Sequence, residues 1–228
     1  MPEGLSGTLI LPRASCRRCA KETGKIEGNV LRTVLWAPRT HLRMKTKRPK
    51  QRPTKFAMQA RVNGQDVTID LPAEDYPTML FMVKAGPPGL LVGRPREVAS
   101  FEGAWIKPLN LIGKALNNYG IQSAASPVMD TLRYSQMLAK IAHSYAVAEL
   151  GSDSFNALLP EFILNGSGWP YHLVGGEQNE TPPSNALHEL GLEYREGSDG
   201  RYLVAHIRLF ANLGAPNYLV VVGEGSSA

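Results

Sequence analysis

The chain has 228 residues, with 25 lysines and arginines against 20 aspartates and glutamates and a net charge of +5. This length allows one large domain, or a small module beside a medium one, with a sizeable core. No apolar run reaches the roughly 18 residues that a transmembrane helix needs, and the first residues lack the pattern of a signal peptide. We therefore expect no membrane partner and a cytoplasmic protein.

The charge is distributed very unevenly along the chain. Residues 1–55 hold fourteen lysines and arginines and three glutamates, a local charge of +11, whereas the remainder carries −6. A basic segment such as residues 1–55, which we call the basic head, beside a mildly acidic remainder is typical of proteins that bind polyanions. A solvated cationic linker is the alternative, and the asymmetry favours nucleic acid.

Residues 8–11 predict a short strand, which Pro12 turns toward the two cysteines of the chain. From residue 20 to about residue 35 the apolar residues recur at helical spacing, although Gly24 and Gly28 weaken the predicted helix. These apolar residues are Ile26, Val30, Leu31, Val34 and Leu35. The order of strand, turn and helix is that of the second half of a compact ββα unit.

Both cysteines stand in one Cys-x-x-Cys motif, Cys16-Arg17-Arg18-Cys19. In a reducing compartment such a pair is more often metal-binding or redox-active than a structural disulfide. Two thiolates at this spacing supply two of the four ligands of a structural zinc ion. The flanking arginines favour the thiolate, which suits metal and redox roles equally. A third interpretation treats Cys16 and Cys19 as ordinary small residues near a turn.

The strand Thr8-Leu9-Ile10-Leu11, closed by Pro12 and followed by Cys16-Arg17-Arg18-Cys19, resembles the second half of an HNH endonuclease module of the zinc-stapled type. Residues 2–7 match the loop that precedes this strand in the family. The resemblance covers roughly residues 2–35. It implies Cys16 and Cys19 as ligands of a structural zinc site that is incomplete in this chain, and DNA as the partner.

The family's catalytic residues have no counterpart here. In HNH nucleases a histidine activates water and a divalent metal stabilises the charge that develops on the phosphate. The sequence begins just past the expected histidine, the upstream cysteine pair is absent, and Ala20 occupies the usual asparagine position. His41 lies in a different segment. We therefore expect no catalytic residue and no cleavage by the family mechanism.

Two explanations of this pattern compete. In the first, the native chain extends upstream of Met1 and carries the intact module, and Mg²⁺ or Mn²⁺ would then serve catalysis. Alternatively the protein is a remnant that keeps the basic surface without the chemistry. Either way, zinc bound by this chain alone would be substoichiometric or shared in a homo-oligomer.

Residues 38–55 predict an extended or loosely ordered basic connector, because Pro49 and Pro53 disfavour helix and no acidic residue is present. Cations spread along a backbone contact phosphates without reading bases. The predicted nucleic-acid-binding residues are Arg17, Arg18, Arg39, Arg43, Lys45, Lys47, Arg48, Lys50, Arg52 and Lys55.

Residues 56–228 predict a domain of antiparallel strands around one long helix. Asn63-Gly64 between two alternating runs predicts a tight hairpin. Further strands are expected over residues 80–84, 171–174, 202–210 and 218–222. The long helix should begin at Pro127, capped by Ser126, and end at Gly151. A second helical segment, interrupted at Pro160, should span residues 155–164.

The prediction is thus an α+β fold with a partial HNH-like head over residues 1–37, a connector over residues 38–55 and a C-terminal domain over residues 56–228. Lys140 and His143 are expected on a solvated helix face. The predicted function is that of a DNA-binding relative of HNH endonucleases that does not cut. The alternative is a non-enzymatic nucleic-acid-binding or protein-interaction module.

Overall fold

The computed structural model describes residues 1–7, 11, 15–46, 49–110, 112–125, 128–167, 169–177 and 181–225. Helices and antiparallel sheets both contribute to it, which confirms the predicted α+β class. The strand predicted over residues 8–11 falls mostly outside the described residues.

The helices and strands are distributed along the whole described chain. The α-helices are α1 (Arg17–Arg32), α2 (Trp36–His41), α3 (Ile112–Asn118), α4 (Thr131–Leu150), α5 (Leu159–Asn165) and α6 (Pro170–Leu173). Short 3-10 helices are η1 (Glu3–Leu5), η2 (Pro49–Gln51), η3 (Gly89–Val92) and η4 (Ala211–Leu213). The strands are β1 (Lys55–Val62), β2 (Gln65–Pro72), β3 (Met79–Ala85), β4 (Phe101–Pro108), β5 (Ile121–Ala124), β6 (Phe155–Ala157), β7 (Val174–Gly176), β8 (His188–Glu196), β9 (Arg201–Leu209) and β10 (Tyr218–Gly225).

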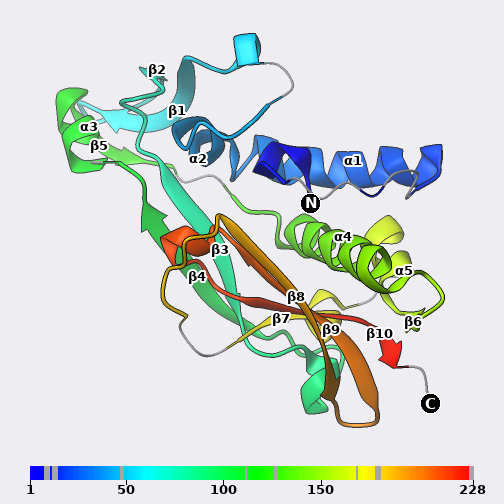
Figure 1. The fold of residues 1–228 in the computed structure, drawn as a ribbon. Coiled ribbons are helices and arrows are strands. Elements are labelled where there is room, and N and C mark those ends of the chain that lie inside the picture. Colours follow the sequence, from blue (N-terminus) through cyan, green and yellow to red (C-terminus); the bar gives the residue numbers. More distant parts are fainter. Residues whose placement is uncertain are drawn as a thin grey trace.

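The strands form a sheet in the order β2-β1-β5, a two-stranded sheet of β3 and β4, and a sheet in the order β6-β10-β9-β8 with β7 also on β10. Helix α4 packs on β9 and β10 with one side, and α1 packs on α4 from the other (Figure 1). The basic head is therefore the outermost layer over the helix that covers the large sheet.

The hairpin of β1 and β2 is confirmed. Val62 pairs with Gln65, and the two turn residues Asn63 and Gly64 have φ angles of 51° and 80°. Both positive angles are what a type I′ turn requires, and Asn-Gly adopts them at little cost. The strands predicted near residues 80–84, 202–210 and 218–222 are confirmed as well.

Helix α4 ends at Gly151 as predicted, but its predicted start was wrong. Residues 128–130 are not helical, and the helix begins at Thr131. The Asp130 carboxylate accepts a hydrogen bond from the Arg133 backbone N–H at 2.9 Å, so Asp130 is the cap. Ser126 and Pro127, the cap and first residue predicted from sequence, lie outside the described residues.

Two other segments also differ from the prediction. Residues 155–157 form β6 rather than helix, because they pair with the end of β10, and Pro160 opens the short helix α5 instead of interrupting a longer one. Residues 170–173 form α6, and strand structure begins only at Val174. Strand β8 was not predicted at all.

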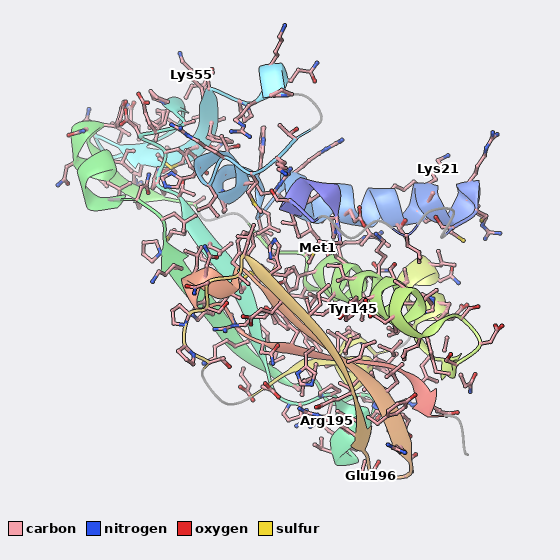
Figure 2. The ribbon with its side chains drawn as sticks, viewed as in Figure 1. Met1, Lys21, Lys55, Tyr145, Arg195 and Glu196 are labelled. Carbon is pink, nitrogen blue, oxygen red and sulfur yellow. The ribbon has the colours of Figure 1, made fainter. Side chains whose placement is uncertain are left out.

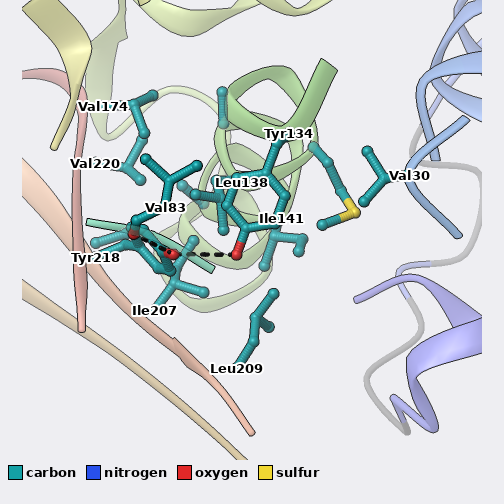
Figure 3. Packing of buried hydrophobic residues seen from close by; sticks show 14 of the residues in the cluster. Val30, Val83, Tyr134, Leu138, Ile141, Val174, Ile207, Leu209, Tyr218 and Val220 are labelled. Carbon is teal, nitrogen blue, oxygen red and sulfur yellow. Dashed lines mark hydrogen bonds between the residues drawn. The ribbon is translucent and has the colours of Figure 1, made fainter. Parts of the chain in front are cut away.

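One hydrophobic core joins the head to the rest of the protein. Ile26 and Val30 of α1 belong to the same buried cluster as Met137 and Leu138 of α4 and Val220 of β10 (Figure 3). Leu5 of η1 is fully buried in this cluster. Residues 17–32 therefore take their position from contacts with the C-terminal half of the chain.

Two buried tyrosines link the small sheet to the large one through this core. The Tyr218 hydroxyl donates to the Val83 carbonyl oxygen at 2.8 Å, and the Tyr134 hydroxyl donates to the Tyr218 oxygen at 3.2 Å (Figure 3). Burial raises the pKa of both tyrosines. Strand β3, helix α4 and strand β10 are thus joined by one chain of hydrogen bonds.

These hydrogen bonds predict that two conservative substitutions lower the free energy of unfolding by unequal amounts. Tyr218→Phe should lower the free energy of unfolding by about 1–3 kcal/mol, because a buried carbonyl loses its donor. Tyr134→Phe should lower the free energy of unfolding less, since the Tyr218 hydroxyl still donates to the Val83 carbonyl oxygen. Urea denaturation of both variants measures this, and a larger loss for Tyr134→Phe would contradict the assigned direction of the chain.

Candidate nucleic-acid interface and cysteine pair

Helix α1 carries its positive charge on one side. Arg17, Arg18, Lys21, Lys25 and Arg32 are exposed, and at 100° per residue they fall within about 100° of one another around the helix axis. Ile26 and Val30, on the opposite side, are 2% exposed. The exposed outer face of α1 is therefore a cationic stripe, interrupted only by the pairing of Lys25 with Glu22 at 2.8 Å.

An ion pair fixes the rotation of α1 against α4. Lys140 Nζ lies 2.6 Å from Glu27 Oε1, and both side chains are largely covered. The prediction that Lys140 and His143 lie on a solvated face is wrong, because α1 covers this side of α4 and both residues face the space between the helices. An isolated exposed pair contributes little to stability, whereas breaking a covered pair leaves an uncompensated charge.

The segment that follows α1 is more regular than the extended or loosely ordered connector that was predicted. Helix α2 occupies residues 36–41, with Pro38 near its start where no hydrogen bond is lost. Arg39 donates hydrogen bonds to the carbonyl oxygens of Gly4 and Leu31. Arg52 donates to the Met44 carbonyl oxygen. Burial and the nearby Arg52 charge lower the pKa of Arg39.

The ten predicted nucleic-acid-binding residues therefore divide into three groups. Arg39 and Arg52 hold backbone carbonyls, so their first role is structural. Lys47 and Arg48 lie outside the described residues. The exposed members are Arg17, Arg18, Arg43, Lys45, Lys50 and Lys55.

One exposed lysine from each of the two segments lies on the same side of the molecule. Lys21 of α1 and Lys55 of β1 both lie along the upper edge of the view in Figure 2, whereas Arg195 and Glu196 lie at the opposite end. The α1 stripe and the exposed cations of residues 43–55 together form what we call the basic face. Sequence reasoning missed Lys21, Lys25 and Arg32 as members of it, although their spacing on the predicted helix could have revealed them.

The two cysteines begin the same helix. Cys16 is the N-cap of α1, and its sulfur accepts a hydrogen bond from the Cys19 backbone N–H at 3.4 Å. The two sulfurs are 3.4 Å apart, and both thiols are free. The backbone N–H and then the thiol of Cys19 lower the pKa of the Cys16 thiol, while the same thiol contact raises the pKa of Cys19.

This geometry suits two ligands of one soft metal ion, or the two halves of a disulfide. Within the part of the chain that the structure describes, no group of three or more histidine, cysteine, aspartate or glutamate side chains is placed to hold a metal ion. The cysteine pair therefore supplies two zinc ligands at most.

A cavity of about 730 Å³ lies between the start of α1 and helices α4 and α5. Cys16 and Cys19 line it together with the Glu27–Lys140 ion pair and His143. The His143 Nδ1 atom is buried and has no hydrogen-bond partner among the described residues, and burial lowers the pKa of this histidine. Glu27 and Lys140 balance each other's charge in this cavity, and Met1 and Glu149 also line it.

Two further histidines take part in polar networks of the large sheet. The ring of His188 contacts the Leu5 carbonyl oxygen at 2.7 Å and the Phe210 backbone N–H at 3.1 Å, which ties η1 to the sheet. The ring of His206 lies 2.8 Å from Glu193 and 3.9 Å from Glu177 on opposite sides. Both arrangements hold strands and loops together and do not converge on one ligand position.

Comparison of the chain with protein-family models, curated proteins and solved structures finds no match. Across the described ranges, none of the helices combines the length and the apolar character needed to cross a bilayer. The basic face and the cysteine pair are therefore the observations on which a functional proposal rests.

The difference in pKa between the two thiols predicts that Cys16 is the more reactive toward alkylation. Iodoacetamide should alkylate Cys16 before Cys19, with a rate–pH midpoint below that of an ordinary thiol, because the thiolate is the nucleophile. Cys19→Ala should raise that midpoint partway, since the thiol donor is lost and the backbone donor stays. Peptide mass spectrometry over a pH series measures both, and faster alkylation of Cys19 would contradict the assignment.

Proposed function

We propose that this protein binds DNA through its basic face, as a relative of HNH endonucleases that does not itself cut DNA. The observation that carries the proposal is the cationic stripe of α1, which is exposed while the opposite side of the helix is fixed in the core. A rigid row of cations is complementary to the regularly spaced phosphates of a duplex.

The expected mode of binding is to the DNA backbone. Lysines and arginines on the basic face would contact phosphates and release counterions, so affinity would fall steeply with salt. Contacts of this kind position a protein on DNA without reading its sequence. The resemblance of residues 2–35 to the HNH module supports DNA over other polyanions.

Cys16 and Cys19 would supply half of a zinc site at the start of the same helix. A tetrahedral structural site requires four ligands, and a second copy of the chain could provide the other two. Zinc would then fix the first turn of α1, where Arg17 and Arg18 stand between the two ligands. The metal would thus fix the backbone of the two arginines that contact phosphates.

A dithiol–disulfide role for the pair is the second candidate. It is favoured by the 3.4 Å separation of the sulfurs and by the lowered pKa of Cys16. The two roles differ in a simple way, because zinc binding requires both thiols reduced and a disulfide excludes it. Thiol counting after zinc addition under mild oxidant separates them: protection of both thiols supports the zinc role, and loss of two thiols supports the redox role.

The DNA proposal predicts a difference between two matched double variants. Lys21→Gln with Lys55→Gln removes two cations of the basic face, whereas Lys84→Gln with Lys107→Gln removes two exposed lysines of β3 and β4. The first pair should weaken duplex binding and reduce the salt slope by about 2, because each lost phosphate contact contributes about 1. The second pair should change neither.

Fluorescence anisotropy with a labelled duplex over a salt series measures both quantities. Equal effects of the two double variants would mean that net charge, and not the basic face, governs binding. Absence of duplex binding by the unmodified protein at low salt would overturn the proposal itself.

A further inference from the structure

An aromatic cavity of about 580 Å³ opens beside α2, apart from the cavity at the cysteines. Four aromatic residues line it: Trp36, Phe56, Tyr76 and Phe81. The rings of Trp36 and Phe56 meet edge to face at 5.2 Å between centroids, and those of Phe56 and Tyr76 are 5.0 Å apart. Phe56 is buried, but Trp36 is 45% exposed, so the largest ring remains open to solvent.

The most cationic segment of the chain begins and ends at this cavity. Residues 37–55 carry eight lysines and arginines and no acidic residue. Trp36 immediately precedes this segment and Phe56 immediately follows it, and these two rings are in contact. The two ends of this segment therefore meet at the cavity, and Arg43, Lys45, Lys50 and Lys55 within the segment are exposed.

We infer that this cavity receives an unpaired base of single-stranded DNA, whose phosphates contact the exposed cations Arg43, Lys45, Lys50 and Lys55. Proteins that bind single strands combine aromatic rings, on which bases stack, with cations that follow the backbone. An apolar peptide would also suit the aromatic lining, but residues 37–55 contain eight lysines and arginines and no acidic residue, which favours a polyanion. The inference rests on the proposed DNA binding and extends it to a strand that is not base-paired.

The lining of the cavity also predicts that it does not distinguish between bases. Most of its other residues are apolar, among them Met58, Pro77, Met79 and Leu116. Such a lining offers stacking to every base and few hydrogen bonds to base edges. Binding should therefore tolerate any sequence, because stacking uses the ring face that all bases share.

The arrangement of α1 and α2 relates the two DNA contacts. The cationic stripe of α1 ends at Arg32, and α2 begins only four residues later at Trp36. A duplex on the stripe and an unpaired strand at the cavity would thus be neighbours. The expected ligand is DNA in which a single strand continues from a duplex.

The test compares two tryptophans of similar exposure. Trp36→Ala removes the open ring of the cavity, and Trp169→Ala removes a ring that is 50% exposed but does not line it. The probes are a labelled oligodeoxythymidylate and a labelled duplex. Trp36→Ala should weaken single-strand binding about tenfold, whereas Trp36→Phe should retain most of it, because the phenyl ring still stacks. Duplex binding should stay nearly unchanged, because Trp36 is not one of the cations that contact the phosphates.

A second measurement leaves Trp36 in place and so does not depend on the folding of the alanine variant. In a protein with Trp105→Phe and Trp169→Phe, the remaining tryptophan fluorescence reports on Trp36 alone. Stacking of a base should quench it when oligodeoxythymidylate is added. Absence of quenching at saturating oligonucleotide would overturn the inference.

The outcomes separate this inference from the proposed function. Duplex binding without single-strand binding, or equal losses in Trp36→Ala and Trp169→Ala, would overturn the cavity assignment and leave the basic face intact. Tighter binding of a matched RNA strand would replace DNA by RNA as the ligand. Failure to bind any nucleic acid would overturn both.

Discussion

The packing of α1 on α4 is the contact on which the functional surface depends. Ile26 and Val30 enter the common core, and Glu27 meets Lys140 beside them. Fully burying each such aliphatic side chain contributes roughly 1.5–3 kcal/mol, more than a partly exposed ion pair provides. The apolar contacts therefore decide which side of α1 faces inward, and the ion pair restricts its rotation. Because those positions are fixed, Arg17, Lys21 and the other cations of the stripe must face solvent.

Both ends of α1 then lead to chemically distinct sites. The helix of 16 residues is about 24 Å long at 1.5 Å per residue. The cysteine pair stands at its first turn, and Trp36 with the aromatic cavity follows its last. In our proposal the helix is a rigid spacer between a zinc half-site and a site for an unpaired base, with phosphate contacts along its length. Arg39, which binds carbonyl oxygens of Gly4 and Leu31, keeps α2 attached to that spacer.

Local sequence signals predicted the elements that local interactions determine. Asn63-Gly64 specifies the hairpin turn by its own backbone preferences, and the apolar spacing of residues 26–35 indicates α1. Positions set by distant partners were not predictable. Residues 155–157 become strand only because β10 is beside them. Arg39 donates a hydrogen bond to a backbone carbonyl oxygen, and no feature of the sequence marks that partner. The basic face could be anticipated from composition, but the aromatic cavity could not, because Trp36, Phe56 and Tyr76 meet only in the folded chain.

The central claim is that the outer side of α1 and the exposed cations of residues 43–55 form one DNA-binding face. Lysine acetylation footprinting of the protein with and without a duplex, followed by peptide mass spectrometry, tests it most directly. The account predicts that DNA slows modification of Lys21, Lys25, Lys50 and Lys55. Exposed Lys84 and Lys107 should react at the same rate with or without DNA. Protection of Lys84 and Lys107, with no protection of α1, would contradict the account.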